Sequence, residues 1–110
     1  MPDRLCQGLL IDTQRCRIVP TTFTGLQDMQ VRVGGLLEVA YTWPNGDTLY
    51  VDEEGLIRED GDLVFFTIDK RPDQPLAGSG LVVGREIDED GNTAPPSITI
   101  EDLIAAVGFL

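Results

Sequence analysis

The side chains best suited to bind a charged ligand include two small basic pairs. These are Arg15 with Arg17, and Lys70 with Arg71 in a stretch rich in proline and glycine. Guanidinium groups form bidentate hydrogen bonds with phosphate, so these four residues are the candidate contacts for a small anionic nucleotide. The plainer alternative is that they are solvated, the first pair on a sheet face and the second in a loop.

Two acidic turns provide candidate contacts of the opposite kind. Their carboxylates would face a basic partner protein, as in an inhibitor that mimics DNA, and they are Asp52, Glu53, Glu54, Glu59, Asp60 and Asp62. Opposite charges favour association and make it sensitive to salt. The alternative is again a solvated surface, because carboxylates commonly occur in turns.

The residues that enzymes use most often are poorly represented. The chain has no histidine, which removes Cys-His and Ser-His pairs and the commonest transition-metal ligand. The segment 86–97 superficially resembles a calcium loop, but its last position is Ser97 instead of a bidentate glutamate. We therefore expect a protein that is not an enzyme, with no catalytic residues, no cofactor and no metal site.

The net charge and the length of the chain disfavour nucleic-acid-binding, membrane-spanning and multidomain proteins. The formal net charge is −11, from 19 acidic and 8 basic residues, and such a surface repels nucleic-acid backbones. We expect no direct binding to nucleic acid. The 110 residues suit a single domain, 1–110, and no apolar run approaches the roughly 20 residues of a membrane span. The first four residues show no signal-peptide pattern, so we expect a cytoplasmic protein.

The most legible secondary structure is a β-hairpin within Gly34–Gly55. Alternating apolar residues lead into the turn residues Pro44, Asn45 and Gly46, and a second β-prone run ends at the first acidic turn. The two cysteines belong to an earlier pair of strands. At strand spacing Cys6 and Cys16 lie too far apart for a disulfide, so we expect two half-buried thiols.

The remaining elements complete an antiparallel sheet. Thr24 and Gln27 form a predicted capping box for a helix over 25–33 that Gly34 ends, and Thr99 begins a terminal helix that Gly108 closes. The predicted strands and loops are strands 8–12 and 15–19 (ended by Pro20), a buried strand 63–68, a loop 69–80 and a core strand 81–84. The expected fold is α+β, a mostly antiparallel sheet of about five or six strands with two short helices.

This order of elements resembles a family of small proteins encoded by phages, plasmids and actinobacteria, which is described only as a domain of unknown function. The resemblance is carried by Gly34-Gly35 with Leu37-Glu38-Val39, by Val51 to Leu56 and by Gly80 to Gly84, and it covers roughly 24–107. It implies an accessory protein of a phage or mobile element in the bacterial host cytoplasm. It implies no catalytic residues.

These observations favour a non-enzymatic binding protein that acts against a host defence system. It would bind a defence protein, or it would sequester an anionic nucleotide signal through Arg15, Arg17, Lys70 and Arg71. Two alternatives stay open: an acidic DNA mimic that inhibits a nucleic-acid-binding host protein, and a structural homo-oligomer with a contact at Phe109 and Leu110.

Overall fold

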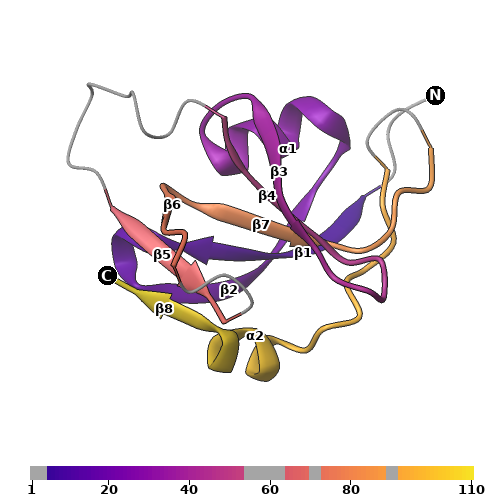
Figure 1. The fold of residues 1–110 in the computed structure, drawn as a ribbon. Coiled ribbons are helices and arrows are strands. Elements are labelled where there is room, and N and C mark those ends of the chain that lie inside the picture. The colour runs from indigo at the N-terminus through magenta and orange to yellow at the C-terminus, as the bar shows by residue number, and fades with distance from the viewer. Residues whose placement is uncertain (1–4, 54–63, 70–72, 89–91) are drawn as a thin grey trace.

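The computed structural model describes residues 5–53, 64–69, 73–88 and 92–110 (Figure 1). Within these ranges the elements are, in chain order, β1 (Cys6–Asp12), the 3-10 helix η1 (Thr13–Arg15), β2 (Arg17–Phe23), α1 (Gly25–Val33), β3 (Leu37–Thr42), β4 (Thr48–Asp52), β5 (Phe65–Ile68), β6 (Leu76–Ala77), β7 (Gly80–Val83), α2 (Ile100–Ala106) and β8 (Val107–Phe109). The predicted α+β class with a mostly antiparallel sheet is confirmed.

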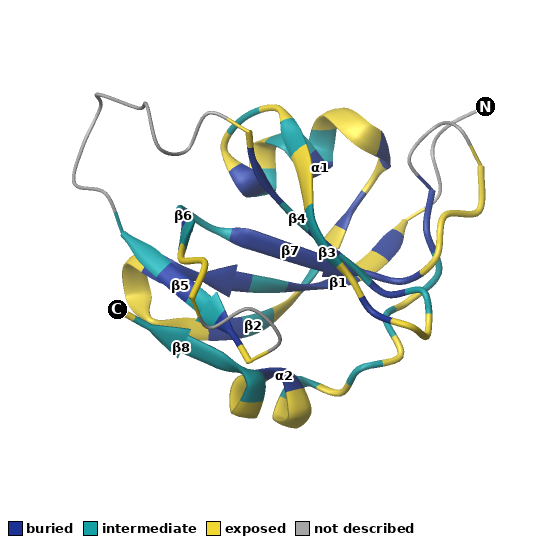
Figure 2. Cartoon of the chain, in the orientation of Figure 1, coloured by how far each residue is buried: buried dark blue, intermediate teal, exposed yellow. Residues whose placement is uncertain are grey.

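Five strands form the main sheet, in the order β2-β1-β7-β4-β3, and every neighbouring pair is antiparallel. The strand β7 lies in the middle and each of its four residues is buried, as Figure 2 shows. A strand covered on both faces needs apolar side chains in both directions. This explains why Gly80-Leu81-Val82-Val83 is continuously apolar, as predicted for a core strand.

The main sheet is the middle of three layers. The helix α1 packs against β3, β4 and β7 on one face, where Met29 and Val33 meet Phe23 and Leu81. The opposite face packs against α2 and a second sheet of three strands in the order β6-β5-β8. The core on that side includes Ile11, Leu49, Phe66, Val82 and Leu103, and each of these side chains is at least 99 % buried.

The predicted central hairpin is present as β3 and β4. The Trp43 N–H donates to Asp47 O at 2.8 Å and the Gly46 N–H to Trp43 O at 3.0 Å, which closes the turn, and Gly46 has the left-handed φ of 97°. The register shifts between Val39 and Tyr41, so β3 carries a bulge on the outer edge of the sheet. A bulge on an edge strand discourages the pairing of a further strand.

The first hairpin differs from the prediction at its turn. The turn is a 3-10 helix, with Cys16 in the left-handed conformation at φ 51°, and Asp12 pairs with Arg17. Arg15 therefore precedes β2 and does not lie on a strand. Pro20 does not end β2, which continues to Phe23, because β2 is an edge strand whose outer side needs no backbone donor.

Two further boundaries and one capping contact differ from the prediction. The terminal helix ends at Ala106, because Val107–Phe109 pairs with β5 and forms β8 before Gly108 can act as a cap. The predicted loop 69–80 contains the short strand β6. At the start of α1, Thr24 is the N-cap as predicted, but Asp28 Oδ2, and not Gln27, accepts its N–H at 2.8 Å.

The cysteines are thiols, as expected, but they differ in exposure. Cys6 is 3 % exposed inside the α1 side of the core, whereas Cys16 is exposed at the first turn. The prediction of two half-buried thiols is therefore wrong. The two residues lie at opposite ends of the β1–β2 hairpin, since Cys6 pairs with Phe23 and Cys16 follows η1.

Candidate functional site

The predicted basic pair Arg15 and Arg17 converges, but on a carboxylate of the chain itself. Arg15 Nη1 and Arg17 Nε lie 3.1 Å and 3.2 Å from the same atom, Asp12 Oδ2. The Asp12 side chain is 10 % exposed, whereas the two arginine side chains are 64 % and 57 % exposed. The carboxylate thus offsets one of the two positive charges. Lys70 and Arg71 lie outside the described residues.

Of the six predicted acidic contacts, Asp52 and Glu53 are described, and both lie at the end of β4. Asp52 pairs with Leu37 and is only 7 % exposed, so it offers little surface to a partner. Glu53 is exposed, and its backbone N–H donates to Leu36 O at 2.9 Å. Glu54, Glu59, Asp60 and Asp62 lie outside the described residues.

Asp52 lines a hollow that no sequence motif pointed to, and Glu53 is the next residue along the chain. The Val31–Leu36 hollow has a volume of about 710 Å³ and is lined by Gln27, Gln30, Val31, Gly34, Gly35, Leu36 and Asp52. Val31 is 70 % exposed and Leu36 is 54 % exposed, which is unusual for two large apolar side chains that line one hollow. The spacing of Val31 from Met29 is the signal that was missed. Two residues turn the helix by about 200°, so Val31 faces away from the core.

The end of α1 explains why this hollow is open. Gly34 has φ 98°, and the N–H groups of Gly34 and Gly35 both donate to Gln30 O, at 2.7 Å and 3.0 Å. This cap reverses the chain direction after the helix. A Cβ added at Gly34 would meet nothing within 4 Å, so the surface there is unfilled. The turn sets Val31 and Leu36 on either side of two residues without side chains.

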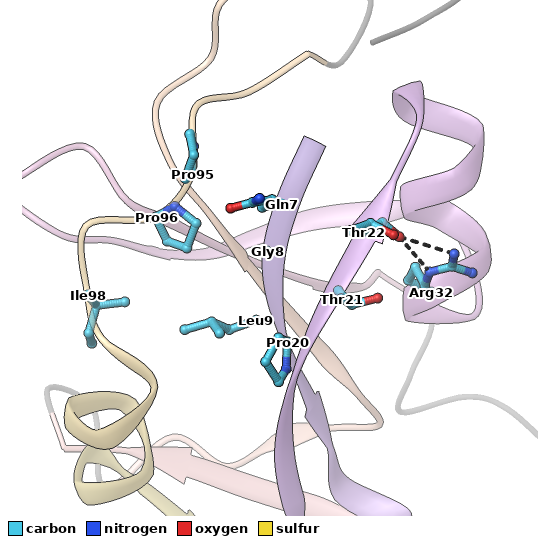
Figure 3. A pocket seen from close by; sticks show the side chains of 10 residues that line it. All are labelled: Gln7, Gly8, Leu9, Pro20, Thr21, Thr22, Arg32, Pro95, Pro96 and Ile98. Carbon is cyan, nitrogen blue, oxygen red and sulfur yellow. Dashed lines mark hydrogen bonds between the residues drawn. The ribbon is translucent and has the colours of Figure 1, made fainter. Parts of the chain in front are cut away.

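A second concave surface, the β1–β2 groove, lies at the β2 edge of the main sheet. Its volume is about 620 Å³ (Figure 3). Leu9 faces Pro20 and Gln7 faces Thr22 across the two strands. The opposite wall is the segment that carries Pro95, Pro96 and Ile98, and the remaining lining residues are Gly8, Thr21 and Arg32.

Arg32 is the one ionisable residue among those that line this groove, and its guanidinium is already engaged. Nε and Nη2 donate to Thr22 O at 3.3 Å and 3.1 Å, as the dashed lines in Figure 3 show. Nη1 lies 3.5 Å from Asp28 Oδ1. The groove is therefore close to neutral, and its prolines, hydroxyls and one amide suit an uncharged ligand better than a phosphate.

The wall of the groove is held by a buried carboxylate. Asp47 is 1 % exposed, and its two oxygens accept the backbone N–H groups of Ser97 and Ile98, each at 2.8 Å. The segment between β7 and α2 is thereby attached to the turn of the central hairpin. Asp47 thus has a structural task, and its two oxygens are aimed at backbone donors inside the protein.

Cys6 and Tyr50 are two further polar side chains with notable surroundings. Cys6 Sγ donates to Asn92 Oδ1 at 3.8 Å, and Asn92 Nδ2 donates to Asp88 Oδ2 at 2.8 Å, which links β1 to the segment after β7. Burial, and secondarily the negative charge of Glu86, raise the pKa of Tyr50 above its ordinary value of 10.0. Among the described residues, no three His, Cys, Asp or Glu side chains are grouped to hold a metal ion.

A comparison with protein families shows which family the chain belongs to. The model of the family described as a domain of unknown function, DUF3846, matches residues 6–107. The chain belongs to the DUF3846 family. The match begins at Cys6, well before residue 24, so the β1–β2 hairpin is part of the DUF3846 domain. No curated protein and no solved structure matches this DUF3846 chain significantly. Within the described residues, no helix is long and apolar enough to cross a membrane.

Proposed function

We propose that this DUF3846 protein is a non-enzymatic binding protein that docks onto a basic surface of another protein. The observation that carries the proposal is the imbalance of exposed charge. Among the described residues, three arginines are exposed, Arg15, Arg17 and Arg85, against eight exposed carboxylates: Glu38, Glu53, Asp69, Asp73, Glu86, Asp88, Glu101 and Asp102. Two of the three arginines are also partly neutralised by Asp12.

This imbalance favours a basic protein over an anionic nucleotide as the ligand. A phosphate would have to compete with Asp12 for Arg15 and Arg17, and the guanidinium in the β1–β2 groove is bonded to Thr22 O. A basic protein meets a field of the opposite sign, which accelerates encounter and steers orientation. The same field disfavours direct contact with DNA or RNA.

The setting we propose is that of an accessory protein of a phage or mobile element, which acts in the bacterial cytoplasm. A host defence protein with a basic face, such as a nucleic-acid-binding surface, would be its partner. An acidic protein of this size can block such a face by occupying it, and this requires no catalytic group. The mechanism is competition for a charged surface.

Selection from a random peptide library tests the proposal without a known host. The full chain is immobilised, and the displayed peptides are first depleted on an unrelated protein of similar net charge, which removes those that bind any acidic surface. We expect the retained peptides to be enriched in lysine and arginine, and the enrichment to disappear at high salt, where the Debye length falls to about 3 Å at 1 M. Retention of no peptides, or of neutral or acidic ones, would contradict the proposal.

A further inference from the structure

We infer that the Val31–Leu36 hollow is the docking surface, and that it takes a basic segment that inserts an aliphatic side chain between Val31 and Leu36. Lysine or arginine residues on either side of that aliphatic residue then face Glu53. This inference rests on the proposed function and specifies its site and the chemistry of its partner.

The apolar part of the surface has no partner within the described chain that would remove it from water. Val31 lies on the side of α1 opposite Met29, and Leu36 follows the glycine cap of the helix. Each exposes more than half of its surface, at 70 % and 54 %. An inserted aliphatic side chain would remove both from water, and burial of apolar surface is the main favourable term in association.

The shape of the hollow suits an inserted side chain. The hollow, of about 710 Å³, is shallow and open to solvent, which suits a single side chain inserted from a partner better than an enclosed small molecule. Gly34 and Gly35 have no side chains to fill the middle of the hollow. Gln27 and Gln30, on the helix, supply amide groups to its lining. The amides can bond to the backbone of the incoming segment, and they contribute no charge of their own.

The charge around the hollow selects the occupant. Asp52 lines the hollow but is only 7 % exposed, so the carboxylate that a partner can reach is that of the next residue, Glu53, which is exposed. None of the residues that line the hollow is basic. The nearest arginine on the same helix, Arg32, contacts Thr22 O and Asp28. A second copy of the chain would bring another net charge of −11 to this surface, so self-association is disfavoured and a cationic segment is favoured.

The β1–β2 groove fits this occupant less well. Its lining carries no carboxylate that could attract a basic segment, and its one charged residue, Arg32, already contacts Thr22 O and Asp28. The exposed apolar residues Leu26 and Val39, at 48 % and 53 %, do not line the hollow. They are therefore matched controls for Val31 and Leu36.

The inference is tested with the full chain, labelled with 15N, and a six-residue peptide of two leucines flanked on each side by a lysine and an arginine. The control peptide replaces both leucines with serine and keeps the charge. We expect the largest amide shifts at residues 27–36 and 53, and an affinity roughly tenfold lower for the serine peptide.

Matched variants make the assignment specific. Val31→Ser and Leu36→Ser should each weaken binding of the leucine peptide several-fold, whereas Leu26→Ser and Val39→Ser should leave it nearly unchanged. Glu53→Lys should weaken binding, whereas Glu101→Lys, on α2 at the other face of the sheet, should have a much smaller effect. All six positions are exposed, so each variant is expected to fold, which thermal unfolding checks.

Three results would overturn the inference. Shifts concentrated in the β1–β2 groove or on α2 would place the docking surface elsewhere and leave the proposed function standing. A dimer in sedimentation, with shifts at the hollow upon dilution, would make a second copy the occupant. If neither peptide binds at low salt, the inference fails, and if the library selection also retains no basic peptides, the proposed function fails with it.

Discussion

Oδ1 of Asp47 accepts a 2.8 Å hydrogen bond from the backbone N–H of Ser97, fifty residues further along the chain. Oδ2 does the same for the next residue, Ile98. A carboxylate that is 1 % exposed remains satisfied only because both of its oxygens meet donors. The turn of the central hairpin and the wall of the β1–β2 groove are therefore one connected unit.

Replacement of Asp47 by asparagine should destabilise this unit. The amide offers one acceptor oxygen and a donor in place of the second oxygen, so the N–H of Ser97 or of Ile98 loses its acceptor. A hydrogen bond to a charged group contributes about 1.5–3 kcal/mol, and urea unfolding should show a loss of that size. The exposed Asp73→Asn is the control and should change stability by less than about 0.5 kcal/mol. Equal stability of Asp47→Asn and the native chain would refute the role of this contact.

Gly84 should tolerate no side chain. An added Cβ would overlap the backbone oxygens of Ala94 and Pro95, while the Gly84 N–H bonds to Ala94 O at 2.9 Å. Backbone atoms cannot move aside as a flexible side chain can, so Gly84→Ala must displace the segment that leads to the groove. We expect a loss of about 1–3 kcal/mol in the free energy of unfolding, measured in urea. An unchanged midpoint and slope would show that the two segments are not in this close contact.

The two thiols should react at very different rates. Cys16 is exposed and Cys6 is 3 % exposed, so a thiol reagent should label one cysteine in the native protein and both in denaturant. Mass spectrometry of the labelled chain gives the count. In Cys16→Ser the rapid native reaction should disappear. Rapid labelling of Cys6 in the folded protein would contradict the packing between β1 and α1.

Stability should fall at high pH because of Tyr50. Burial, and secondarily Glu86, raise its pKa in the folded chain, while the unfolded phenol ionises near the ordinary value of about 10. Below that value the contribution is fully present. As the pH rises from about 10 towards the folded pKa, the unfolded chain loses a proton that the folded chain keeps, so the free energy of unfolding decreases.

Urea unfolding followed at several pH values between about 9 and 11 checks this effect. Tyr50→Phe should show a shallower decrease with pH than the native chain, and Tyr41→Phe serves as a control for the loss of a phenol from the same hairpin. Identical pH profiles for Tyr50→Phe and the native chain would show that the Tyr50 phenol is not perturbed.

The features that were predictable from the sequence are those that depend on residues close together along the chain. The central hairpin follows from alternation on both sides of Pro44-Asn45-Gly46, and both helix starts follow from their N-caps, Thr24 and Thr99. The strand β7 follows from its short, continuous, β-branched apolar run, because a strand buried on both faces requires apolar side chains in both directions. Each of these signals spans only a few residues.

The features that were missed depend on distant pairing or on side-chain direction. Val107 continues the helical pattern of α2 in the sequence. In the structure, Val107–Phe109 instead pairs with the edge of β5 as a strand, and no residue near Val107 indicates this pairing. The contact from Asp47 to Ser97 joins segments fifty residues apart. Arg15 and Arg17 meet at Asp12 because the turn that joins β1 to β2 is the 3-10 helix Thr13–Arg15, which brings both arginines back to the end of β1.

The Val31–Leu36 hollow is a different case, because its helical side was predictable and its Leu36 side was not. The helix 25–33 and its glycine cap were expected, and in such a helix Val31 must lie opposite the buried Met29. The sequence does not show that Leu36 is exposed beside it, since Leu36 precedes a β-strand whose alternation is equally compatible with burial. The approach of Asp52 to the end of α1 is a consequence of the sheet order.

The ionic-strength dependence of binding tests the central claim most directly. A peptide retained by the full chain is titrated calorimetrically at increasing salt concentrations. We expect the affinity to fall by about tenfold or more as the Debye length shrinks from about 10 Å at 0.1 M to about 3 Å at 1 M, with a smaller fall for Glu53→Gln than for the native chain. An affinity independent of salt would contradict docking through opposite charge.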